Sequence, residues 1–236
     1  MKFLEVAALD HINSALVFDT PECKVFGRIE PYSCKVAGAD KKLYKYLEGR
    51  YNEEISNFSS SVSPENNLND IISPFGPMNQ TSTRRTLFNL IATLNASYPD
   101  YDFSDVKPEQ FVKQPSISNV CNYINNTLFN LQHGWIVTDL NLWKIVDDII
   151  DLEECDVYSF DPDMDSDPNT EEGAIWSFNF FFYNKKMKRI LYFTVRGLSV
   201  NAPLQEDESL SGSSSDSELI SRAMPYEEYV MGDIEM

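Results

Sequence analysis

Two aromatic-rich segments, separated by a short basic stretch, constrain the fold of this chain more than any other feature. Residues 176–182 place an aromatic side chain at every even position, which is the period of a β-strand. In residues 190–195, Leu191, Phe193 and Val195 alternate with Ile190, Tyr192 and Thr194. A hairpin this apolar would aggregate in water, so we expect it inside a sheet covered on at least one face by helices or further strands. Only the basic residues of its turn must reach solvent: Lys185, Lys186, Lys188 and Arg189.

Helical periodicity appears in several other segments. Apolar residues spaced by three or four positions predict helices within residues 3–16, 40–51, 87–94, 117–128 and 143–150. Ser82 or Thr83 is the expected cap of the third of these helices, and the fourth follows Pro115-Ser116.

Two further segments read as strands. Residues 25–34 contain Gly27 and Pro31, which predict a strand with a bulge or a strand at a sheet edge. Residues 157–160 form a shorter strand pattern before the aromatic hairpin. The fold class expected from these elements is α/β (α+β), with a central, largely antiparallel sheet flanked by helices.

Composition shifts along the chain predict its organisation. Residues 52–82 are rich in Asn, Ser, Pro and Gly, which favours a flexible linker. Residues 201–236 are rich in Ser and acidic residues, which favours a disordered tail. We therefore expect one globular domain made of residues 1–51 and 83–200, interrupted by the linker and followed by the acidic tail.

The acidity of the chain is regional. The net charge of −18 divides into −12 over residues 147–172, −8 over residues 201–236 and +2 over the remainder. Acidic segments repel phosphates and favour basic protein surfaces, so we expect a protein partner and no direct binding of nucleic acid. No run of about 18 uncharged apolar residues occurs, and the N-terminus lacks the plan of a secretory signal, so we expect a soluble, intracellular protein.

No catalytic or cofactor motif is visible. The four cysteines are scattered, without a Cys-x-x-Cys pair, so reduced and mostly buried thiols are favoured over a zinc cluster. Neither of the two histidines lies in a nucleophile context, and no phosphate-binding glycine loop is present. A carboxylate-based hydrolase stays open as an alternative, although most acidic pairs lie in segments that read as mobile. The sequence predicts a protein that is not an enzyme and needs no cofactor.

An acidic loop over residues 161–172 resembles a calcium-binding loop in its spacing. Ser166 replaces the glycine that the sharp turn requires, two prolines stiffen the loop, and the flanking patterns read as strands. A solvated loop that meets a basic partner is the favoured interpretation. Its candidate partner-binding residues are Asp161, Asp163, Asp165 and Asp167.

The basic turn of the hairpin, residues 185–189, has three interpretations. Lys185, Lys186, Lys188 and Arg189 are candidates for a nuclear-import signal or for a partner contact, and a charged hairpin tip without further role is the alternative. Lys35 is a further candidate contact.

Five ordered blocks resemble a known family. Phe-Gly-Arg-Ile-Glu-Pro-Tyr-Ser-Cys opens the first block and Arg-Arg-Thr-Leu-Phe-Asn-Leu-Ile opens the second; the blocks cover residues 26–40, 84–95, 99–104, 154–168 and 176–190. Together they are similar to the signature of the eukaryotic Maf repressors of RNA polymerase III transcription, in wording closest to the budding-yeast type.

This resemblance implies a nuclear regulator without enzymatic activity. Such a protein binds RNA polymerase III directly and prevents it from engaging its promoter-bound initiation factor. Growth-signalling kinases and phosphatases are implied as further partners, and shuttling between nucleus and cytoplasm as the localisation. A monomer is expected. The competing hypothesis is a small-ligand-binding regulatory protein, because a sheet with aromatic faces is able to enclose a pocket.

One departure from the family pattern concerns phosphorylation. The segment 52–82 is short and holds no Arg-Arg-x-Ser site, whereas the budding-yeast type carries kinase sites in a much longer linker. Ser63-Pro64 and Ser73-Pro74 are the generic sites that remain there.

Overall fold

The aromatic hairpin forms the centre of a β-sheet. In the computed structural model, which describes residues 1–35, 38–61, 72–162, 167–168 and 173–201, β8 (Ala174–Asn184) pairs with β9 (Arg189–Ser199). The register runs from Ala174↔Leu198 to Asn184↔Arg189, with a β-bulge between Ala174 and Trp176. The predicted alternation and the predicted turn are therefore both confirmed.

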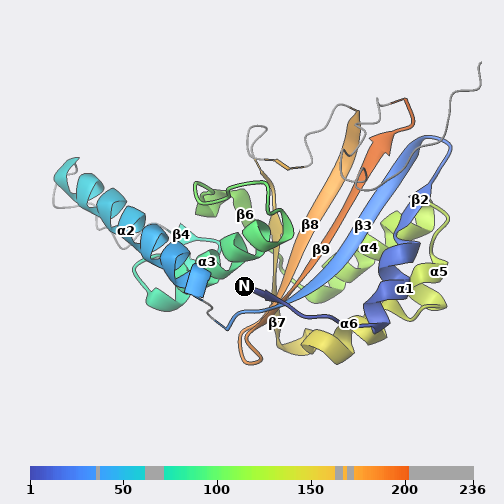
Figure 1. The fold of residues 1–236 in the computed structure, drawn as a ribbon, viewed down its shortest axis with the longest axis horizontal. Coiled ribbons are helices and arrows are strands. Elements are labelled where there is room, and N and C mark those ends of the chain that lie inside the picture. Colours follow the sequence, from blue (N-terminus) through green and yellow to red (C-terminus); the bar gives the residue numbers. More distant parts are fainter. Residues whose placement is uncertain (36–37, 62–71, 163–166, 169–172, 202–236) are drawn as a thin grey trace, which may run out of the picture. The chain divides into compact units, whose positions relative to one another are not determined.

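The sheet has seven strands, and each of its pairings is antiparallel. Its order is β1 (Lys2–Phe3), β3 (Cys23–Ser33), β9, β8, β7 (Cys155–Phe160) and β6 (Phe111–Lys113), and β2 (Val17–Asp19) pairs with β3 beside β1. The prediction of an α+β domain with a central antiparallel sheet is confirmed (Figure 1).

The five predicted helices are present, with shifted ends: α1 (Ala8–Ala15), α2 (Gly38–Ser61), α3 (Thr81–Ser97), α4 (Ile117–Asn130) and α6 (Leu142–Ile150). The short helix α5 (Trp135–Thr138) was not predicted. Short 3₁₀ turns lie at η2 (Pro108–Gln110) and η3 (Leu152–Glu154), and β4 (Ile72–Ser73) pairs with β5 (Gly76–Pro77). The Ser116 hydroxyl accepts from the Asn119 amide at 3.1 Å and caps α4. The predicted caps of α3 are wrong, because Gln80 precedes this helix and provides no side-chain cap.

Helices cover both faces of the sheet. In Figure 1, α1, α4, α5 and α6 lie on one side, while α2 and α3 lie on the other. Phe178, Phe180 and Phe182 pack with the first group of helices, whereas Phe181 and Tyr183 pack with the second. Consecutive residues of β8 thus enter two separate cores, as the period of a strand requires.

The prediction of a bulge or an edge position for the Gly27 and Pro31 segment is wrong. β3 pairs with β9 along its whole length without a register shift, and β1 and β2 pair with its other side. Pro31 tolerates this position because it follows the end of the β2 pairing and precedes the β1 pairing, so its missing N–H breaks no ladder bond. A Cβ atom on Gly27 would lie 3.0 Å from the Leu16 Cβ, which explains the small residue.

The predicted linker differs from the structure at both of its ends. Helix α2 continues to Ser61, and the β4–β5 hairpin begins at Ile72. Residues 62–71 and the predicted tail from residue 202 lie outside the described residues, so the linker and the tail stay predictions. None of the helices in the described part of the chain is both long enough and apolar enough to cross a membrane.

Candidate partner-binding surface at the basic turn

The basic turn between β8 and β9 is held by one buried amide. The Asn184 side chain is 1% exposed; its Oδ1 accepts from the Met187 amide at 2.9 Å, and its Nδ2 donates to the Ile150 carbonyl at 2.8 Å. Lys188 takes a left-handed backbone conformation with φ of 53° and completes the reversal. The turn is therefore a defined scaffold for its cations, fixed to the end of α6.

The basic turn and part of the acidic segment neutralise each other. Lys185 Nζ lies 2.8 Å from Asp156 Oδ2, and Lys186 Nζ lies 2.5 Å from Glu154 Oε2. Lys113 also reaches Asp156, at 2.8 Å. Burial alone would raise the pKa of Asp156, but its two lysine partners hold that pKa below the ordinary value. Sequence reasoning treated these two charged segments as separate, and β7–β8 pairing brings them together.

The other predicted cations differ in how the fold uses them. Arg189 donates to the Ile149 carbonyl at 2.9 Å and so serves packing between β9 and α6. Lys35 is exposed and stands next to Cys34, whose amide donates to the Lys188 carbonyl at 2.8 Å. The fold thus gathers Lys35 and Lys188 at one place, although more than 150 residues of sequence separate them.

The acidic loop starts at the opposite end of β7. Asp161 is exposed, and its amide donates to the Gln110 carbonyl at 2.8 Å, next to β6. The length of β7 separates Asp161 from the basic turn, roughly 20 Å at the rise of an extended strand. Asp167 is half-buried, and Asp163 and Asp165 lie outside the described residues. The loop and the turn are therefore two separate surfaces.

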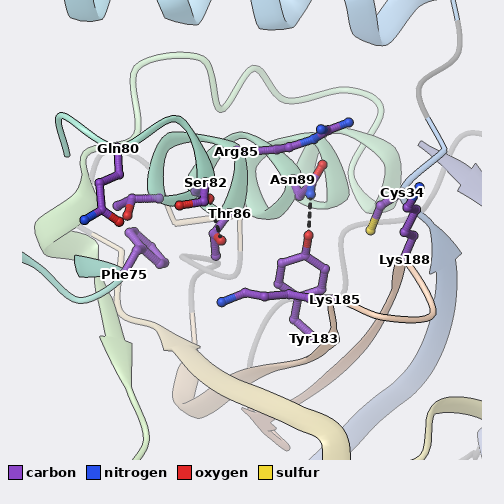
Figure 2. Close-up of a pocket in the computed structure, with 11 residues that line it drawn as sticks. Cys34, Phe75, Gln80, Ser82, Arg85, Thr86, Asn89, Tyr183, Lys185 and Lys188 are labelled. Atoms are coloured by element: carbon purple, nitrogen blue, oxygen red, sulfur yellow. Dashed lines mark hydrogen bonds between the residues drawn. The ribbon is translucent and has the colours of Figure 1, made fainter. Parts of the chain in front are cut away.

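Sequence reasoning did not select the groups that complete the surface beside the basic turn. A cavity of about 430 Å³ lies between the start of α3 and the turn, and Figure 2 shows Arg85, Asn89 and Tyr183 among the side chains that line it. The Asn89 Nδ2 donates to the Tyr183 hydroxyl at 2.7 Å. The Arg84-Arg85 pair at the start of a predicted helix was the available signal, but only packing of α3 on β8 shows which arginine faces the turn.

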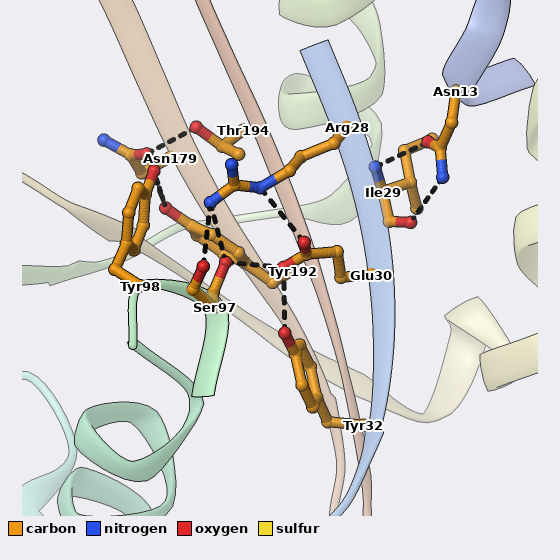
Figure 3. Close-up of polar contacts among 10 residues, drawn as sticks. All are labelled: Asn13, Arg28, Ile29, Glu30, Tyr32, Ser97, Tyr98, Asn179, Tyr192 and Thr194. Carbon is orange, nitrogen blue, oxygen red and sulfur yellow. Dashed lines mark hydrogen bonds and ion pairs between the residues drawn. The ribbon is translucent and has the colours of Figure 1, made fainter. Parts of the chain in front are cut away.

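A polar network fixes the other end of α3 to the sheet (Figure 3). Arg28 Nη2 donates to the Ser97 hydroxyl at 2.9 Å, and Ser97 donates to Glu30 Oε2 at 2.5 Å. Arg28 Nε lies 3.1 Å from Glu30 Oε1 without an aligned hydrogen bond, so this contact is ionic. The Arg28 guanidinium also lies 4.5 Å from the centre of the Tyr98 ring. These contacts set the position of the helix that carries Arg85.

The described residues give no sign of a metal centre. No group of three His, Cys, Asp or Glu side chains in this part of the chain is close enough to hold an ion. All four cysteines are free; Cys23 and Cys34 are buried, and Cys121 and Cys155 are half-buried. What the surface offers is positive charge and hydrogen-bond donors at the turn, with a separate acidic site at the far end of β7.

Comparisons with known proteins agree with the resemblance seen in the five sequence blocks. The family model "Maf1 regulator" matches residues 25–194. The repressor of RNA polymerase III transcription maf1 of Schizosaccharomyces pombe is 47% identical over 199 residues, 84% of this chain and 83% of that protein. The repressor of RNA polymerase III transcription MAF1 of Saccharomyces cerevisiae is 35% identical over 140 residues, 58% of this chain and 33% of that protein.

The fold agrees as well. The crystal structure of citrus MAF1 in space group C 2 2 21 superposes with a TM-score of 0.61 at 37% identity, and the match covers 81% of this chain and 98% of the citrus chain. The matched family segment begins in β3 and ends in β9, and so includes the basic turn, α3 and the acidic loop. On these grounds the chain belongs to the Maf1 regulator family.

Proposed function

We propose that this chain represses transcription by RNA polymerase III, without enzymatic activity, by binding the polymerase directly and blocking its engagement with the promoter-bound initiation factor. The observation that carries this proposal is the family match over residues 25–194, together with the name of the fission-yeast relative. That this chain is of the budding-yeast type within the family stays a prediction. The budding-yeast relative matches over a shorter segment and at lower identity than the fission-yeast relative.

Direct binding is tested with purified RNA polymerases I, II and III. The tagged protein should retain polymerase III selectively, and the purified protein should lower the yield of a polymerase III promoter in a reconstituted transcription reaction. Retention of all three polymerases to the same degree, or repression without retention, would refute direct and selective binding.

We further propose the acidic loop as one contact with the polymerase. Asp161 is exposed at the end of β7, and a polymerase surface that receives DNA is basic, so opposite charges would meet there. The basic turn is a weaker candidate for an electrostatic contact with the polymerase, because Lys185 and Lys186 already have acidic partners in the fold. The acidic loop is thus the better candidate for an electrostatic contact.

A quadruple variant tests this contact. It combines Asp161→Asn, Asp163→Asn, Asp165→Asn and Asp167→Asn. Exposed ion pairs contribute about 0.2–1 kcal/mol each, so the loss of four should lower affinity for polymerase III at least about fourfold, and the salt dependence of binding should flatten. The control removes four exposed acids elsewhere, with the same change of net charge: Glu5→Gln, Asp10→Asn, Glu22→Gln and Asp100→Asn. Equal losses in both variants would mean that net charge matters and the loop does not.

Localisation and regulation belong to the same proposal. We infer that the protein represses in the nucleus and shuttles to the cytoplasm under the control of growth-signalling kinases and phosphatases. Lys35, Lys185, Lys186, Lys188 and Arg189 stay the proposed import or contact residues. Lys35 and Lys188 suit that role better than Arg189, because Arg189 is half-buried and bonded to Ile149.

A further inference from the structure

Polar and charged residues outnumber apolar ones among those that line the cavity between α3 and the basic turn. Its volume of about 430 Å³ lies in the range of small-molecule sites. Figure 2 shows Arg85 and Lys188 at one end and Phe75 and Gln80 at the other, with Tyr183 and Lys185 between them. Ser82 and Thr83, from the first turn of the 17-residue helix α3, also line it.

Three cationic side chains line this cavity. They are Arg85, Lys185 and Lys188, and no carboxylate lines the cavity with them. Among the described residues, Arg85 and Lys188 have no acidic partner, because Glu48 pairs with Arg84 instead and Asp156 pairs with Lys185. The cavity therefore carries positive charge that no carboxylate in the described part of the fold neutralises. Such a site attracts an anion.

A buried hydroxyl adds a directional donor. Tyr183 is 6% exposed and accepts from Asn89 Nδ2, while Asn89 Oδ1 accepts from the Tyr44 hydroxyl. The Tyr183 oxygen accepts the hydrogen bond from Asn89, but its own O–H proton has no acceptor among the described residues. This proton is therefore free to be donated into the cavity. Burial raises the pKa of Tyr183 to about 12, so the hydroxyl keeps its proton at neutral pH. The start of α3 contributes the positive end of a helix dipole at the same place.

We propose that this cavity binds the phosphate group of a small phosphorylated compound. A phosphate dianion matches the two cations without an acidic partner, Arg85 and Lys188, and a hydroxyl donor better than a single carboxylate does, and the Arg85 guanidinium suits its oxygens. The Phe75 ring and the Gln80 amide, at the other end of the cavity, are placed to contact the remainder of the compound. This inference goes beyond polymerase binding, and its test needs no polymerase.

Isothermal titration calorimetry of the whole chain tests the proposal. The probes are inorganic phosphate, adenosine monophosphate and adenosine, all at the same ionic strength. Both phosphate-bearing probes should bind and adenosine should not. Tighter binding of the nucleotide than of phosphate would identify a compound as the ligand, whereas equal binding would identify phosphate itself as the recognised species.

The variants separate a built site from a general charge effect. Arg85→Gln and Lys188→Asn should each weaken phosphate binding roughly 10- to 100-fold, as expected for loss of a hydrogen bond to a charged group. Asn suits position 188 because it tolerates the left-handed backbone there. The control, Lys186→Gln, removes the same charge from the same turn outside the cavity and should leave affinity unchanged.

Three results would overturn the proposal. The first is no binding of either phosphate-bearing probe at 10 mM by a folded sample, a concentration on the order of ten times a weak millimolar Kd. The second is an equal loss in Lys186→Gln and in the two cavity variants. The third is unchanged affinity in Lys188→Asn, which still decides the matter if Arg85→Gln fails to fold.

Discussion

Neighbouring aromatic residues of β8 provide the sharpest test of a sheet covered by helices on both faces. Phe181 and Phe182 are both 0% exposed, but Phe181 belongs to the core under α3 and Phe182 to the core under α6. Truncation of either residue to alanine should therefore be costly. In a sheet with one open face, one of the two truncations would cost little, because its side chain would face water.

The magnitudes follow from the contacts. Burial and the cavity left behind predict about 3–5 kcal/mol for each Phe→Ala change. Phe181 also stacks on Tyr192 at 4.6 Å between ring centres, and such pairs add about 0.5–1.5 kcal/mol. Phe182 has a more distant ring contact, at 6.2 Å to Trp143. We expect Phe181→Ala to lie at the upper end of the range and Phe182→Ala at the lower end.

Urea unfolding followed by circular dichroism measures both losses, because the tryptophan next to Phe182 would complicate fluorescence. In thermal unfolding of the same variants, Tm should fall by roughly 6–20 °C, at about 2–4 °C per kcal/mol for a domain of this size. Met187→Ala, in the exposed turn, is the control and should stay within about 0.5 kcal/mol. A loss below about 1 kcal/mol at either phenylalanine would refute two covered faces; if an alanine variant does not fold, the leucine variants should show the same order.

Two further predictions concern buried polar groups. Arg28→Met leaves Glu30 beside Tyr32 and Ser97 without its cation and should cost about 1–3 kcal/mol in urea unfolding, discounted for the partial exposure of Arg28. The double variant Arg28→Met/Glu30→Gln should recover part of this loss, and no recovery would contradict an ionic role. Stability should also fall as pH rises from about 9 to 12, because burial raises the pKa values of Cys34 and Tyr183 to about 12 and the folded chain retains protons that the unfolded chain loses. Cys34→Ala should reduce this slope in urea titrations at pH 8 and 10.5, and a slope that it leaves unchanged would exclude Cys34 as its source.

Sequence patterns predicted the parts of the fold that local chemistry determines. The period of two in residues 176–182 located β8, and the basic residues located its turn. Ser116 correctly marked the start of α4 because its side chain acts on its own helix. The position of β3 was missed, since Pro31 carries a strong local signal for an edge, and only the staggered ends of β1 and β2 make an interior position acceptable.

The candidate site depended on contacts that no local pattern records. Lys185 and Asp156 were each identified by charge, but their ion pair follows from the β7–β8 register. Arg85 and Tyr183 line the same cavity because α3 packs across β8, and the hydrogen bond from Asn89 to Tyr183 joins residues 94 positions apart. A sequence reader sees two arginines at the start of a helix and an aromatic residue near a turn, and neither one indicates a cavity.

The long pairing of β3 with β9 has a consequence for how the chain folds. β1 and β2 pair with one side of β3, but the other side pairs along its whole length with residues 189–199. A nascent chain on the ribosome therefore holds β3 with one open edge until nearly the whole domain has been synthesised. Contacts of such high sequence separation slow folding. A strand edge exposed for that time invites wrong pairing, so the interval between synthesis of β3 and of β9 is when this protein is most exposed to aggregation and most dependent on chaperones.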